Sequence, residues 1–82
     1  MKVSFVHKMR EVIEACSPQT QRFGLLVYTL MTSENKPDDV DEFLRVVLAL
    51  SQTQIDASRV EFNDKLVAWN RAHGVPGDAL LS

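Results

Sequence analysis

The chain has 82 residues, of which 45% are hydrophobic and 24% are charged, and its formal net charge is −2. This composition is ordinary for one folded domain and too apolar for a disordered chain. The small negative charge excludes a general attraction to nucleic acid or to anionic membranes. A core of this size is worth only ~3–5 kcal/mol net, so we expect close helix packing or an oligomer interface to support it.

The first predicted helix covers residues 3–16. Its apolar side chains recur at i, i+4, i+7 and i+11 from Phe5 to Cys16, which predicts an amphipathic stripe facing a core. Cys16 lies on that stripe, so we interpret it as a small core residue and not as a nucleophile. The charged residues of this helix are expected to face away from the core; they are Lys2, Lys8, Arg10, Glu11 and Glu14. The three basic residues among them would form a basic patch.

Ser17-Pro18 is expected to end the first helix and to begin the second, over residues 18–33. Proline disfavours a helical conformation in the residue before it and suits the first helical position. The second helix holds the longest apolar run, Phe23 to Met31, which has no polar face and must be covered on all sides. We therefore place this helix at the centre of the bundle. Gly24 predicts a close helix–helix contact that a larger residue would not permit.

A polar loop at residues 33–37 separates the second helix from the third, which is predicted over residues 39–50. Asp39 and Glu42 have the spacing of a capping box at the start of this helix. Acidic residues also suit the positive end of the helix dipole there.

The fourth helix is predicted over residues 54–72, and two pairs of residues could cap it: Ser51 with Gln54, or Thr53 with Asp56. Gly74 and the proline that follows it are expected to end this helix. Loops this short make neighbouring helices pack beside each other. The sequence therefore predicts an all-α fold, a compact bundle of four short helices without strands. We expect one domain over residues 1–76 and a flexible tail at residues 77–82.

The sequence has no arrangement of residues typical of an enzyme. His7 and His73 stand apart from each other, and neither lies beside a candidate nucleophile. There is no glycine-rich phosphate loop and no Gly-x-Ser-x-Gly motif. The single Cys16 cannot close an internal disulfide, and no Cys/His cluster could hold zinc. We expect no catalytic activity, no cofactor and no metal.

The N-terminal residues do not resemble a signal peptide, because charge follows Met1 at once and no small-residue cleavage site follows. The longest apolar stretch has nine residues, whereas a membrane-spanning helix needs about 20. Together with one unpaired cysteine, these features predict a cytoplasmic protein.

The segment from Leu50 to Ala57 resembles the opening of a helix-turn-helix of the phage-repressor type. That family has a turn glycine four residues after the alanine, where this chain has Glu61 in a segment predicted to be continuous helix. The recognition helix would offer phosphates little positive charge; its residues there are Asn63, Asp64 and Lys65. A DNA-binding regulator with a degenerate helix-turn-helix is therefore an alternative and not the first hypothesis.

Charge is unevenly distributed along the chain. Residues 1–33 contain four basic and two acidic residues, whereas residues 34–45 contain five acidic and two basic ones. The acidic residues of the second segment are Glu34, Asp38, Asp39, Asp41 and Glu42. They have two interpretations: a well-capped, solvated helix start, or a docking patch for a basic protein surface.

The surplus of apolar surface on the second and third helices, beside this acidic cluster, predicts a small non-enzymatic protein–protein interaction module. Small acidic helical proteins of this character often act as regulators, as antirepressor-like inhibitors or as adaptors, frequently in phages. We expect the acidic cluster to bind the partner, which could be a DNA-binding regulator, with Tyr28 and Trp69 as candidate anchors. The alternative is a homo-oligomer that assembles through the same apolar surface.

Overall fold

The computed structural model describes residues 5–74 of the chain. Within that range the backbone forms four α-helices and no strand: α1 (Phe5–Glu14), α2 (Pro18–Met31), α3 (Val40–Leu48) and α4 (Gln52–Ala72). The predicted all-α bundle is confirmed. The predicted helix ends agree with the observed ones within two residues, except for the predicted start of the first helix at residue 3, which lies outside the described residues. The tail predicted at residues 77–82 lies outside the described residues.

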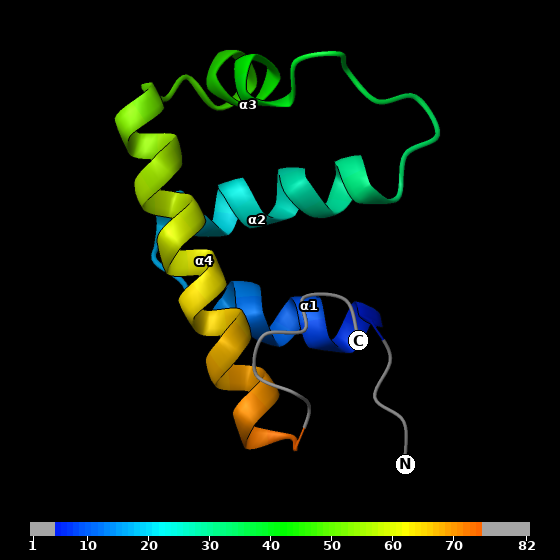
Figure 1. Ribbon diagram of the computed structural model, residues 1–82, viewed down its shortest axis with the longest axis vertical. Helices are drawn as coiled ribbons and strands as arrows, with labels where there is room; N and C mark the ends of the chain where they lie inside the picture. The colour runs from blue at the N-terminus through cyan, green and yellow to red at the C-terminus, as the bar shows by residue number, and fades with distance from the viewer. Residues whose placement is uncertain (1–4, 75–82) are drawn as a thin grey trace.

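Three helices form a stack, and the fourth crosses it. α2 lies between α1 and α3, which do not contact each other, and α4 runs along one side of all three (Figure 1). The expected central position of α2 is therefore observed, although α4 also contacts every other helix. The apolar run of α2 is not covered on all sides, because Leu25 is 58% exposed and Met31 is 37% exposed.

Side-chain caps fix the start of α3 and of α4. The Asp39 carboxylate accepts a hydrogen bond of 3.0 Å from the backbone N–H of Glu42. Ser51 and Gln54 form a complete capping box, in which each side chain accepts a bond from the backbone N–H of the other, at 3.2 and 2.9 Å. Asp39 caps α3 as predicted, but its capping box with Glu42 is incomplete, because only the bond from the Glu42 N–H forms. Ser51 with Gln54 is the pair that caps α4.

α3 ends two residues earlier than the sequence predicts. Ala49 has φ 57° and ψ 43°, which is the left-handed conformation that glycine or asparagine usually supplies at a helix end. The backbone N–H of Leu50 then bonds to the carbonyl of Arg45 at 3.1 Å. Nothing in the local sequence predicts this end, because alanine is a strong helix former.

Two clusters of buried apolar side chains meet at Phe62, which packs against both. The clusters consist of Val12, Leu66 and Trp69, and of Phe23, Leu44 and Ile55. Gly24 lies where α1, α2 and α4 come closest, because a Cβ atom there would be 2.9 Å from both Ile13 Cγ1 and Phe62 Cε1. The predicted close contact at Gly24 is confirmed.

Lys8 differs from the sequence-based expectation. It is only 2% exposed, and its ammonium lies 5.3 Å from the centre of the Trp69 ring. Its aliphatic stem can pack against apolar neighbours while the charge contacts the face of the indole. Burial also lowers the pKa of the Lys8 ammonium. The predicted basic patch is therefore wrong for Lys8, and Lys2 lies outside the described residues.

Candidate functional site

An apolar groove opens in the middle of the bundle, where all four helices contribute side chains. Its volume is about 340 Å³. The apolar residues that line it are Met9, Phe23, Val27, Met31, Val40, Leu44, Phe62 and Leu66, and two polar residues of α4, Arg59 and Asn63, complete the wall. We call this cavity the central groove.

The central groove is open to solvent at one end. Phe23, Val27 and Met31 are four residues apart, so they share one face of α2. Phe23 is 3% exposed, whereas Met31 is 37% exposed and Val40 is 42% exposed. We call the end of the groove formed by Met31 and Val40 its mouth. Apolar side chains this accessible at the edge of a cavity are typical of a binding surface.

The connection that joins the two residues of the mouth is acidic. Residues 32–39 carry Glu34, Asp38 and Asp39 against a single basic residue, Lys36. The side chains of Glu34 and Asp38 form no ion pair with any residue in the described part of the chain. The carboxyl end of α2 adds a partial negative charge in the same region. The mouth is therefore apolar with a negative edge.

The other acidic residues of the predicted patch have different positions. Asp39 is occupied as the cap of α3, and Asp41 forms an ion pair with Arg59 at 2.7 Å. Glu42 is exposed, but it follows Val40 by two helical positions and so lies about 200° away around α3. Of the five predicted acidic residues, Glu34 and Asp38 lie in the loop between Met31 and Val40 and form no ion pair with a described residue.

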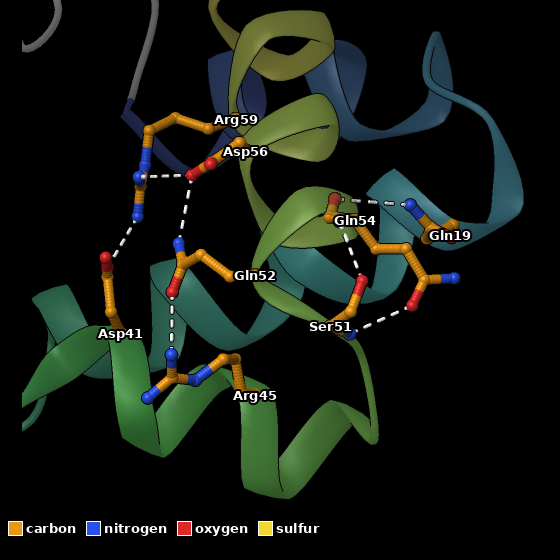
Figure 2. Close-up of polar contacts among 8 residues, drawn as sticks. All are labelled: Gln19, Asp41, Arg45, Ser51, Gln52, Gln54, Asp56 and Arg59. Carbon is orange, nitrogen blue, oxygen red and sulfur yellow. Dashed lines mark hydrogen bonds and ion pairs between the residues drawn. The ribbon is translucent and has the colours of Figure 1, made fainter.

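A chain of polar contacts joins α3 to α4 beside the groove (Figure 2). Arg59 bonds to Asp41 at 2.7 Å and lies 3.5 Å from Asp56. Gln52 donates to Asp56 at 3.0 Å and accepts from Arg45 at 2.8 Å. These contacts fix the angle between the two helices. They also neutralise Arg59, so that the wall of the central groove carries no uncompensated cation.

The two predicted aromatic anchors do not line the central groove. Tyr28 is half-buried, packs against Phe5 with 5.7 Å between ring centres, and faces the outer side of α1 and α2. Trp69 is 9% exposed and stacks on His73 at 3.8 Å. Its Nε1 has no hydrogen-bond partner among residues 5–74. The structure thus places Trp69 in the core, and an interface role for either residue stays a prediction.

A helix-turn-helix in the predicted register would need a turn glycine at position 61. This chain has Glu61 there, inside the continuous helix α4. Its carboxylate accepts hydrogen bonds from Thr20 Oγ1 at 2.6 Å, from the backbone N–H of Ser17 at 2.6 Å and from Ser17 Oγ at 2.8 Å. The bond from Thr20 and then those from Ser17 lower the pKa of Glu61. Glu61 therefore caps α2 from another helix, a role that no local pattern in the sequence indicates.

The cysteine thiol is held in the core of the described fold. Cys16 is 7% exposed, its Sγ donates to the carbonyl of Val12 at 3.2 Å, and burial raises the pKa of its thiol. Its prediction as a core residue is confirmed. Among residues 5–74, no group of three or more His, Cys, Asp or Glu side chains could hold a metal ion. None of the described helices is long and apolar enough to cross a lipid bilayer.

Comparison with known protein families, with curated proteins and with solved structures finds no match to this chain. A function is therefore inferred from the surface of the chain itself.

Proposed function

We propose that this chain is a protein-interaction module whose central groove binds an amphipathic helix with basic residues, supplied by another protein. The observation that carries the proposal is the mouth of the groove. Met31 and Val40 expose apolar surface there, and the loop that joins them carries the negative charges of Glu34 and Asp38.

The chemistry of the groove favours a helix as its occupant. An amphipathic helix presents apolar side chains at i, i+3, i+4 and i+7, and such a row fits an elongated apolar groove between helices. Apart from Arg59, which Asp41 neutralises, the wall offers the polar side chain of Asn63 alone. A small polar ligand would find few hydrogen-bond partners in the groove, whereas the transfer of apolar side chains from water into it is favourable.

The charge of the mouth favours basic residues on that helix. A lysine or arginine beside the apolar row would meet Glu34 and Asp38, which have no counter-ion among the described residues. Such complementarity accelerates encounter and fixes the direction of the bound helix. The recognition helix of a DNA-binding regulator has this basic amphipathic character. Binding of that helix in the groove would block its access to DNA, which is how an inhibitor of the antirepressor type acts.

A displayed library of short random peptides, selected on the immobilised protein, tests this proposal. We expect selection of peptides with apolar residues at helical spacing and an excess of lysine and arginine. Their affinity should fall at least tenfold when Val40 is replaced by Lys, because the new cation repels the basic peptide and obstructs the mouth. Val46→Lys is the matched control, since Val46 is 72% exposed on the same helix and does not line the groove.

Three outcomes would overturn the proposal. The library could yield no binders, or binders without basic residues. The Val46→Lys variant could lose binding as much as the Val40→Lys variant, which would place the site elsewhere. A variant with Leu80→Ser and Leu81→Ser could bind peptides that the natural chain does not bind, which would identify the chain's own end as the occupant of the groove.

DNA binding is the second candidate function, and one observation favours it. α3 and α4 are joined by Ala49, Leu50 and Ser51, with Ala49 in the left-handed conformation, which is the general geometry of a helix-turn-helix. In this register Gln52 and Thr53 would begin the recognition helix, and the first basic residue of that helix, Arg59, is paired with Asp41. Fluorescence anisotropy of a labelled random DNA duplex at low salt tests this candidate, and absence of binding there would remove it.

A further inference from the structure

A second surface lies on the outer side of α1 and α2, and the buried Met9 is the residue that lines both this surface and the central groove. Val6 is 59% exposed and Leu25 is 58% exposed, and both line a shallow groove of about 300 Å³ with Tyr28. We call it the outer groove. Two exposed apolar side chains beside one half-buried aromatic ring make a continuous apolar patch, and a soluble domain of this size gains stability by covering such a patch.

The charges at the edge of the outer groove are one cation and one anion. Arg10 and Glu14 are exposed, line this groove and lie four residues apart, so they share a face of α1. Neither side chain forms an ion pair with a residue of the described part of the chain. Ile13, which is 8% exposed, also lines this groove.

This arrangement is complementary to itself. A two-fold axis that passes between Arg10 and Glu14 would place α1 of one copy antiparallel to α1 of another. The rotation exchanges the positions of the two charges, so each arginine meets the glutamate of the other copy. Any parallel arrangement would instead put like charges together. A partner of a single charge sign would satisfy only one of the two residues.

We propose that the outer groove is the interface of a homodimer, in which the two copies pack through α1 and α2 about a two-fold axis. Leu25 of each copy packs near the axis against the apolar floor of the other groove, and Arg10 and Glu14 form two symmetric ion pairs across it. The central groove of each copy stays open in this dimer, because its residues on α2, Phe23, Val27 and Met31, lie on another face of that helix.

Sedimentation equilibrium over a range of protein concentrations tests the proposal. We expect a species of twice the monomer mass of 9.3 kDa. Leu25→Asp should prevent it, since it would bury an unpaired carboxylate at the centre of the interface. Val46→Asp is the matched control and should dimerise like the natural chain, because that exposed valine of α3 lies outside both grooves.

Charge exchange provides the sharper measurement. Arg10→Glu alone and Glu14→Arg alone each create two like-charge pairs across the axis and should weaken the dimer at least tenfold. The double variant R10E/E14R exchanges the two charges and should restore dimerisation to within a few-fold of the natural chain. Thermal unfolding of each variant at low concentration shows that the monomers remain folded.

The proposal is overturned if the natural chain stays monomeric at millimolar concentration. It is also overturned if the Leu25→Asp variant dimerises normally, or if the double variant is as weak as the single ones. A dimer that Val40→Lys abolishes while Leu25→Asp leaves it intact would place the interface at the central groove instead. That result would count against the proposed function as well, whereas a monomeric chain that still binds basic peptides would refute the dimer alone.

Discussion

Replacement of Gly24 by alanine should destabilise the fold, although alanine is the better helix former. In an exposed helix this change would stabilise by about 1 kcal/mol. Here the new methyl group would lie 2.9 Å from Ile13 Cγ1 and 2.9 Å from Phe62 Cε1, on two different helices. Neither atom is the free end of a flexible chain, so α2 must move away from α1 and α4 together. Overpacking of this kind costs about 1–3 kcal/mol, so after the gain in helix propensity we expect a net loss of up to about 2 kcal/mol.

Thermal unfolding followed by circular dichroism measures this loss. For a domain of this size it corresponds to a decrease in Tm of up to about 15 °C. Thr29→Ala, at an exposed position of the same helix, controls for helix propensity and should leave Tm unchanged or raise it. Phe62→Leu removes one of the two obstructing atoms, so the double variant G24A/F62L should be more stable than the sum of the single effects implies. An increase of Tm in the Gly24→Ala variant would refute the packing argument.

Three further predictions concern single side chains. The lowered pKa of Glu61 stabilises the fold fully above its ordinary pKa of 4.5, and this stabilisation is lost as pH falls through the lower folded value. Glu61→Gln should therefore flatten the pH dependence of the urea midpoint below about pH 5, and an unchanged pH profile would contradict the cap on α2. Cys16 should react with a thiol reagent only when the domain opens, so that urea accelerates labelling strongly; fast labelling of the folded protein would show that it is accessible. Ser51→Ala should cost about 1 kcal/mol through loss of the capping box, whereas the exposed Thr53→Ala should change stability by less than about 0.5 kcal/mol.

The features that could be predicted from the sequence are those set by neighbouring residues. Three helix starts are of this kind: the proline after Ser17, the cap at Asp39 and the capping box at Ser51. Each acts within one helical turn, so the spacing of residues in the sequence is enough to predict it. The close approach at Gly24 was also predictable, because a glycine inside an apolar helical run has a steric use that outweighs its cost.

The features that could not be predicted depend on residues far apart in the chain. Glu61 caps a helix whose N-cap residue, Ser17, lies 44 residues before it, and Lys8 is buried where its charge contacts the ring of Trp69 on another helix. Hydrophobic periodicity treats both as solvated charges. The central groove is of the same kind. An apolar pattern shows that Met31 and Val40 belong to an apolar face, but only the packed helices show that α3 leaves part of that face uncovered.

The acidic segment and the surplus of apolar surface were visible in the sequence, but the residues of the candidate site were not. The central groove is lined from all four helices, and Glu34 and Asp38 lie in the loop between Met31 and Val40. Two of the five predicted acidic residues have partners inside the fold: Asp39 caps α3, and Asp41 forms an ion pair with Arg59. Whether an acidic residue has a partner inside the fold depends on the three-dimensional arrangement of the helices, which the order of charges along the sequence does not show.

The two proposed interfaces together suggest what the protein would bind best. On α2 the side chains of the central groove and those of the outer groove point about 130° apart, so a dimer would hold two open grooves related by its two-fold axis. A partner that is itself a two-fold dimer, as many DNA-binding regulators are, would meet both grooves at once. The second contact is then intramolecular and raises the overall affinity without any new contact. Leu25→Asp should therefore weaken binding of a peptide dimer joined by a linker, while binding of the single peptide stays unchanged. Equal loss for both would show that the outer groove contributes to the peptide site directly, and that the two surfaces are not independent.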